Sequence, residues 1–281
     1  MPNRQRPEPG QLYLDHVSHF VPDLDAAALL LERLGFAVTP LSVQMTQDGP
    51  AGSSNRCVML EDGYLEFLMP TLDTPVARQM RDRMAKQAGV HLACFGTPVA
   101  DDEHARLAAA GFGPLPVVRL AREVGHDMSA RFNVVRVPPE NMPEGRIQFV
   151  EHLTPEAIWR PEHLAHGTGV TGLAAAYVVA DDPVAVAARY ARFAGLLPRR
   201  DGGTICIRTD RGAVRIATRE HLQAELGAAP NAPAIAGYAL QCRDPAAFAA
   251  RCTAAGLAVS PRGDRFCVQL PPALGGAWMI Q

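Results

Sequence analysis

The feature that most constrains this chain is a pattern of strand, tight turn and helix that recurs four times. Its first copy, residues 14–25, reads LDHVSHFVPDLD, and further copies begin near residues 91, 172 and 236. Strand-like segments follow each copy, so each repeat unit reads as one strand, one helix and three further strands, a βαβββ module. The period is longer than that of solenoid repeats, which predicts small folded modules rather than a stack of turns.

The first module illustrates how the elements are assigned. Alternating apolar residues predict a strand over 14–21, Asp23 is a helix N-cap, and Gly35 ends the helix. Three more strands are expected, beginning with one over 36–45. The second module has longer loops, including one over 121–129 that is placed to close over a neighbouring cavity.

A single βαβββ module has exposed sheet edges, which favour pairing with a second module. We therefore expect an α+β fold with four modules paired into two cupped mixed β-sheets and helices outside. A chain of 281 residues has room for two domains. The expected division is an N-terminal module pair over 12–153, a connector over 154–169 and a C-terminal module pair over 170–281. The cup between paired modules is the natural ligand site.

Composition and charge exclude several classes of partner. The formal net charge is −2 and the basic residues are scattered, so no footprint for a nucleic-acid backbone is present. The longest apolar run, residues 173–180, is too short to span a bilayer. Six cysteines lack ligand-like spacing and are expected to be reduced core residues. We expect a soluble, cytoplasmic protein with a small-molecule substrate, and a homodimer is compatible with the sequence.

Histidine and glutamate occupy matching places in the first two modules: His16 and His91 in the opening strands, Glu66 and Glu151 in the closing strands. Strand alternation places each of them on a largely apolar face. A charged carboxylate on such a face is costly unless it is paired or bound to a metal. Pseudo-symmetry is expected to bring the four together around one divalent ion, Zn, Ni, Co, Mn or Fe, with open positions for water or substrate.

Other polar residues are assigned by the same alternation. His19 and His152 fall on the opposite, helix-facing side of their strands and are expected to be structural. Arg131 and Asn55 are candidate substrate contacts, because a guanidinium in the cup would hold a carboxylate or enolate oxygen by a bidentate contact.

The last two modules lack the ligand pattern. Alignment on the strand pattern puts Ala174 or Ala175 and Gly237 at the histidine positions, and Arg215 and Trp278 near the glutamate positions. This set has no metal-binding capacity. We expect the C-terminal pair to be closed, metal-free and structural.

Several segments resemble a known superfamily. The segments HVSHFVPDL (16–24), GYLE (63–66) and VHLA (90–93) are similar to the vicinal oxygen chelate superfamily, which includes glyoxalases, bleomycin resistance proteins and extradiol dioxygenases. More narrowly, ARF (130–132), FVEHLTPE (149–156) and WRPE (159–162), with His166 following, resemble the glyoxalase-like domain family. The likeness spans about residues 12–200.

The resemblance implies a metal enzyme. In the superfamily, residues at the positions of His16, Glu66, His91 and Glu151 bind the metal of glyoxalase I and related epimerases. This implies a divalent-metal-dependent lyase or isomerase whose substrate chelates the ion through adjacent oxygens, while Glu151 or Glu66 moves a proton at the neighbouring carbon. One alternative is an Fe(II) extradiol-type dioxygenase using His16, His91 and Glu151. The other is a metal-free small-molecule binding or resistance protein.

Overall fold

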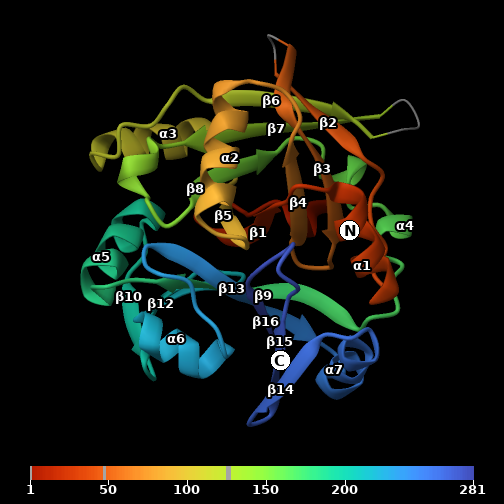
Figure 1. Ribbon diagram of the computed structural model, residues 1–281. Coiled ribbons are helices and arrows are strands. Elements are labelled where there is room, and N and C mark those ends of the chain that lie inside the picture. Colours follow the sequence, from red (N-terminus) through yellow and green to blue (C-terminus); the bar gives the residue numbers. More distant parts are fainter. Residues whose placement is uncertain (1, 47–48, 125–127) are drawn as a thin grey trace.

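The computed structural model of the chain describes residues 2–46, 49–124 and 128–281. Within these residues the chain builds four βαβββ modules, as expected, in an α+β fold of cupped mixed sheets (Figure 1). The N-terminal modules are β1 (Tyr13–Phe20), α1 (Leu24–Arg33), β2 (Ser42–Thr46), β3 (Gly49–Met59), β4 (Tyr64–Pro70), then β5 (Val90–Gly96), α3 (Ala100–Ala109), β6 (Val118–Glu123), β7 (Ser129–Arg136) and β8 (Arg146–His152).

The C-terminal modules are shorter. They are β9 (Val170–Val179), α5 (Pro183–Ala194), β10 (Pro198–Asp201), β11 (Thr204–Arg208), β12 (Ala213–Ala217), then β13 (Ala234–Cys242), α7 (Pro245–Ala254), β14 (Ala258–Arg262), β15 (Arg265–Gln269) and β16 (Ala277–Ile280). The helices before and between modules are η1 (Pro2–Gln5), α2 (Pro75–Lys86), η3 (Pro155–Ala157), α4 (Pro161–Leu164) and α6 (Arg219–Leu226), and η2 (Pro139–Asn141) lies within the second module, between β7 and β8.

Two expected boundaries differ from the structure. The strand expected over 36–45 begins only at Ser42, after Pro40, whose nitrogen has no hydrogen to donate to a ladder. The loop expected over 121–129 is shorter, because β6 continues to Glu123 and pairs with β7. Residues 125–127 of that loop lie outside the described part of the chain.

The first two modules close into a ring of eight strands. Its order is β1-β4-β3-β2-β6-β7-β8-β5, and β5 pairs back onto β1. The junction of β2 with β6 is formed by Met45 and Ala121. A closed ring has an interior lined by alternate residues of every strand. Several polar side chains lie in this interior, which we call the first cup.

The last two modules form a matching but open curved sheet. Its order is β10-β11-β12-β9-β13-β16-β15-β14, with β10 and β14 at the edges. Helix α6 packs on this sheet, and its Leu222 and Leu226 are fully buried among small side chains such as Ala175, Ala236 and Ala277. The second cup is therefore filled by the chain itself.

Helix starts follow from local capping. Asp23, Asp182 and Asp244 each precede a module helix and accept hydrogen bonds from backbone N–H groups of the first turn. Helices α5 and α7 also have proline at their first position, where no donor is lost. These caps turn the chain immediately after each opening strand, which leaves that strand's side chains in the middle of the module.

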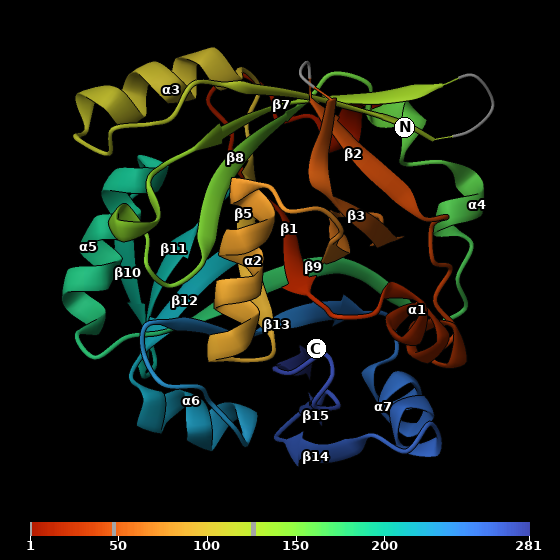
Figure 2. The same cartoon turned by 45° about the horizontal axis from the view of Figure 1, so that its top comes forward.

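The two module pairs share one apolar core. A continuous cluster joins Leu14 and Phe95 of the first pair to Tyr190 and Trp278 of the second. Helices α3 and α5 lie side by side on one flank, and α1 and α7 on the other (Figure 2). Burial of this size is the main favourable term in folding, so the pairs are expected to fold as one unit. Among the described helices, the structure contains none long and apolar enough to cross a membrane.

Strand β1 is irregular near its start. Its register against β5 shifts between Leu14 and His16, which makes Asp15 the extra residue of a β-bulge. Gly63, with φ of +86°, packs against this bulge, and a Cβ on it would lie 2.4 Å from the Asp15 carbonyl oxygen. Only glycine combines this conformation with such a close approach.

We predict that Gly63→Ala destabilises the fold by about 3 kcal/mol, because it adds overpacking to the strain of a left-handed alanine. Gly111→Ala is the control, since Gly111 has φ of +80° but a Cβ added to it would meet no atom within 4 Å. It should cost about 1 kcal/mol. Urea unfolding measures both, and equal losses would show that the bulge contact is unimportant.

Candidate functional site

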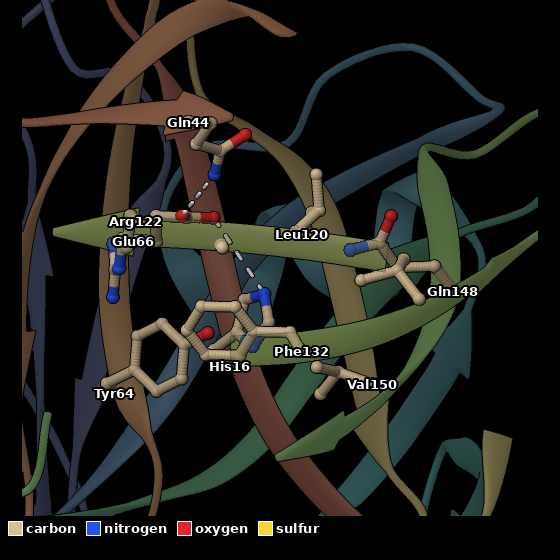
Figure 3. A pocket seen from close by; sticks show the side chains of 11 residues that line it. His16, Gln44, Tyr64, Glu66, Leu120, Arg122, Phe132, Gln148 and Val150 are labelled. Carbon is tan, nitrogen blue, oxygen red and sulfur yellow. Dashed lines mark hydrogen bonds and ion pairs between the residues drawn. The ribbon is translucent and has the colours of Figure 1, made fainter. Parts of the chain in front are cut away.

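A pocket of about 450 Å³ opens inside the first cup. Six strands of both modules line it; Gln44, Glu66 and Arg122 lie near one another, and Gln148 lies across from them beside Leu120 and Val150 (Figure 3). The lining residues are His16, Gln44, Tyr64, Glu66, Leu120, Ala121, Arg122, Phe132, Val134, Gln148 and Val150. A concave, mostly apolar pocket with a few convergent polar groups is the usual form of a small-molecule site.

The bulge at Asp15 creates a buried hydrogen-bonded network. On a regular strand Asp15 and His16 would point to opposite faces, but here His16 Nδ1 donates to Asp15 Oδ1 at 2.7 Å. His152 Nε2 donates to the same carboxylate, 3.1 Å from Oδ2. Asp15 is fully buried and His16 is only 4% exposed. One carboxylate therefore orients two imidazoles and leaves His16 Nε2 facing the pocket.

Glu66 lies opposite His16 and is held by several donors. Its Oε2 accepts from Ser18 Oγ at 2.5 Å, and its Oε1 accepts from Asn55 Nδ2 at 2.6 Å. Gln44 Nε2 lies 3.5 Å from the same Oε1. His16 Nε2 is 3.8 Å from Glu66 Oε2 (Figure 3). The carboxylate has about four lone-pair sites, so these donors leave acceptor capacity toward the pocket.

Arg122 completes the polar wall. Its Nη1 donates to Asn55 Oδ1 at 2.8 Å, its guanidinium lies over the Phe132 ring at 5.3 Å, and its Nε is buried without a partner in the structure. A buried unpaired donor is unfavourable and marks a place where a ligand acceptor would be stabilised. The sequence pattern places residue 122 in a loop, so Arg122 is absent from the predicted site.

The network changes proton affinities. Burial alone would lower the pKa of His16, but the neighbouring Cys94 sulfur and the hydrogen bond from His16 to Asp15 raise it well above the ordinary value. Because burial raises the pKa of the Cys94 thiol, the charged neighbour at neutral pH is Asp15. Burial opposes ionisation of Asp15, yet His152 and His16 hold its pKa well below the usual range. Asp15 thus favours the protonated form of His16, which lies between the side chains of Asp15 and Glu66.

The structure brings together only two of the four predicted ligands, His16 and Glu66. His91 stacks on Phe20 at the end of β1, accepts from the Phe20 backbone N–H through Nδ1 and donates to Gln87 O through Nε2 at 3.0 Å. Both ring nitrogens are used, and burial lowers the pKa of His91 to about 4. Glu151 instead accepts from Asn133 Nδ2 at 2.9 Å and caps the start of α3 through the Ala100 N–H.

Sheet register explains why these two residues lie elsewhere. Ser18 pairs with Glu66 and Cys94 pairs with Gln148, while His16 lies opposite Cys94 and Ser18 opposite Leu92. The module helices α1 and α3 begin at Leu24 and Ala100, 76 residues apart (100 − 24), and the same spacing matches His16 to Leu92. With the parallel pairings above, Glu66 then matches Gln148. Residues 91 and 151 belong to the opposite faces of β5 and β8.

The donor set does not fit a complete metal centre of the expected kind. One imidazole and one carboxylate remain, Leu92 replaces the second imidazole and Gln148 the second carboxylate. No group of three or more His, Cys, Asp or Glu side chains able to hold a metal occurs among residues 2–46, 49–124 and 128–281. Catalytic metal sites ordinarily use three protein ligands of these types.

Of the other residues considered from the sequence, Asn55 and His152 belong to the buried polar network, whereas Arg131 lies outside the pocket. Asn55 is 1% exposed and hydrogen-bonds to both Glu66 and Arg122, so it holds these two side chains in place. Arg131 is exposed on β7, where its backbone N–H donates to Thr154 Oγ1 at 2.8 Å. Its neighbour across β6, Ala121, lines the pocket instead. His152, expected to be purely structural, belongs to the Asp15 network.

The second cup contains no equivalent set. The same register matches His16 to Ala175 and Gly237, as expected, and Glu66 to Arg215 and Met279. The strand pattern in the sequence places Trp278 near the position of Glu66. Trp278 precedes Met279 by one residue and faces the shared core.

Paired βαβββ modules with a cup between them define the vicinal oxygen chelate class of proteins. The sequence model of the glyoxalase-like domain family matches residues 14–194, and the chain belongs to that family. No curated protein sequence matches the chain.

Solved structures with the same fold include enzymes. A hypothetical protein from Staphylococcus aureus aligns with a TM-score of 0.67 at 10% identity, covering 96% of this chain and 99% of that one. A mutant of 4-hydroxymandelate synthase from Streptomyces coelicolor aligns at 0.58 and 15%, covering 96% and 92%. The Mn(II)-bound glyoxalase from Novosphingobium aromaticivorans aligns at 0.58 and 9%, covering 96% and 81%. At these identities the likeness concerns the fold.

We predict that the dialysed protein retains well below one equivalent of divalent metal, because two of four symmetric ligand positions hold Leu92 and Gln148. The double variant Leu92→His and Gln148→Glu should bind Zn(II) at least about tenfold more tightly. A matched control, Leu92→Met with Gln148→Glu, lacks the imidazole and should not. Elemental analysis and zinc titration measure this. One tightly held equivalent in the natural chain, lost in His91→Ala, would restore the four-residue site.

Proposed function

We propose that the chain is an enzyme of the lyase or isomerase type that moves a proton on a small oxygen-rich substrate bound in the first cup. The observation that carries the proposal is the dyad of Asp15 and His16, with His16 Nε2 presented to the pocket 3.8 Å from the Glu66 carboxylate. Buried charges are costly, and perturbed titratable groups converging on a pocket are typical of catalytic sites.

His16 is the general acid. Its raised pKa favours the protonated imidazolium, and Asp15 fixes the ring with Nε2–H directed to the pocket. Such a proton donor neutralises charge that develops on a carbonyl oxygen when a neighbouring C–H proton is removed.

Glu66 is the general base. Ser18 and Asn55 hold its carboxylate in one orientation, and the lone pairs they leave free accept the carbon-bound proton. Return of a proton to the adjacent carbon would complete an isomerisation. In a lyase reaction, a leaving group instead departs from the carbon on the other side of the deprotonated carbon, where the enolate electrons form the new C=C bond and the carbonyl is restored.

Arg122, Gln44 and Gln148 are the groups that hold the substrate. Arg122 supplies a guanidinium with an unused donor for a carboxylate or enolate oxygen, and the two glutamines line the same pocket. Phe132, Val134 and Val150 cover the rest of the pocket and exclude water. The expected divalent ion and the extradiol dioxygenase alternative are not carried into this proposal, since both need ligands that lie outside the cup.

A second candidate is a metal-free binding protein that sequesters a small molecule. The apolar wall of the pocket favours it, because apolar surface alone gives affinity. It leaves unexplained why a buried carboxylate and two imidazoles are maintained beside that wall. A ligand that binds the cup and is never altered would support this second candidate.

The proposal is tested by proton exchange. Small 2-oxo and 2-hydroxy carboxylates are incubated with the protein in D2O, and loss of the C–H signal is followed by NMR. We expect exchange of at least one of them, and a decrease of about 10²–10⁴-fold in His16→Gln, which cannot donate the proton. His104→Gln, on the outer helix α3, is the control. Exchange that is equally fast in His16→Gln would reject the assigned role.

We predict that Asp15→Asn lowers the His16 pKa by at least about one unit and destabilises the fold by about 3 kcal/mol, because a buried charge partner is lost. NMR titration of the His16 ring and urea unfolding measure these changes. Asp73→Asn, an exposed ion-pair residue, should change stability by less than about 0.5 kcal/mol.

The sign of the pH dependence follows from the raised pKa of His16. In the natural protein its contribution to stability is fully present below the ordinary imidazole pKa and is lost as pH rises through the raised value. Activity should fall over the same alkaline range. A His16 that titrates identically in both proteins would contradict the dyad.

A further inference from the structure

A second pocket of about 420 Å³ lies at the other end of the first cup. Three arginines from three elements line it: Arg83 near the end of α2, Arg136 at the end of β7 and Arg146 at the start of β8. The pocket is therefore built from parts of the second module and the helix that precedes it.

These guanidiniums lack acidic partners. Within the described residues, no ion pair involves Arg83, Arg136 or Arg146. Arg83 Nη2 lies 3.4 Å from the Gly145 carbonyl oxygen, and Glu144, the carboxylate whose charge acts on Arg83, is bonded to Arg189. Three half-buried positive charges that form no ion pair with a described carboxylate repel one another, which disfavours the empty pocket.

The geometry leaves many donors free. Arg146 lies over the Phe20 ring, 5.3 Å from its centroid, which fixes the plane of the guanidinium. Arg136 uses its Nε to donate to Gln148 Oε1 at 3.3 Å, and its other nitrogens are left for the pocket. Each guanidinium has five donors in a rigid fork that matches carboxylate and phosphate oxygens. Burial and the charges of Arg136 and Arg83 lower the pKa of Arg146 to about 9, in keeping with crowded cations.

We propose that Arg83, Arg136 and Arg146 form an anion-binding subsite for the phosphate of a phosphorylated small molecule whose reactive end occupies the His16 pocket. Three unpaired cations match a phosphate dianion better than a single carboxylate. Gln148 connects the two ends, because it lines the His16 pocket and accepts from Arg136. This inference names the substrate class and so rests on the proposed function.

The test is calorimetric titration with inorganic phosphate at low ionic strength. We expect saturable binding of one phosphate per chain, weakened at least tenfold in Arg136→Gln and in Arg146→Gln. Arg119→Gln, on the exposed face of β6, is the matched control and should bind like the natural chain. Sulfate should compete, and acetate should compete poorly.

A stability measurement separates binding from a structural role. If the arginines bind an anion, the Arg146→Gln variant in phosphate-free buffer should melt at the same temperature as the natural chain or higher, because repulsion between the guanidiniums is relieved. Phosphate should raise the melting temperature of the natural chain but not of this variant. A lower melting temperature of Arg146→Gln in phosphate-free buffer would assign the arginine to the fold instead.

Further outcomes distinguish this inference from the proposed function. Phosphate binding that is unchanged in His16→Gln but lost in Arg146→Gln supports the subsite even if no exchange is found. If proton exchange requires His16 but phosphate does not bind saturably, the subsite is overturned and the proposed function is not. Loss of phosphate binding in Arg122→Gln rather than in Arg146→Gln would move the anion to the first pocket and also overturn it.

Discussion

The structure of the site depends on one buried carboxylate, Asp15, which accepts hydrogen bonds from His16 and His152 at once. A fully buried carboxylate is stable only if it is paired, and its two partners come from different modules. The interaction requires the bulge in β1, and the bulge in turn requires Gly63 against its backbone. Backbone irregularity, ion pairing and the orientation of a reactive imidazole are therefore one coupled arrangement.

The repeat in the sequence predicted the architecture well, because capping aspartates and strand alternation are local signals. Asp23, Asp182 and Asp244 mark the turn of three modules without reference to distant residues. The identity of the inward face in the second module was not predictable in this way. Every residue of β5 is buried, since one side faces the cup and the other the shared core. Alternation separates the two faces but does not say which one encloses the ligand.

The pairing between strands shows which residues face the first cup, which alternation alone does not. His16 and Glu66 both lie on the inner face of the first module and line its pocket. His91 and Glu151 were chosen by analogy in sequence, whereas the starts of helices α1 and α3 make Leu92 the symmetric partner of His16. No local sequence pattern marks Arg122 as a site residue. Its place in the site comes from the pairing of β6 with β7 and from its contact with Asn55, which is 67 residues away in the sequence.

The ring around the first cup is closed by two junctions between the modules, β1 with β5 and β2 with β6. The pocket inside it is lined by three strands of each module. Neither module alone encloses the pocket, so separation of the two modules would expose the buried side chains of Asp15, His16 and Glu66 to water. Water screens interactions between such groups, and the electrostatics of the site therefore depend on the assembly of the two modules.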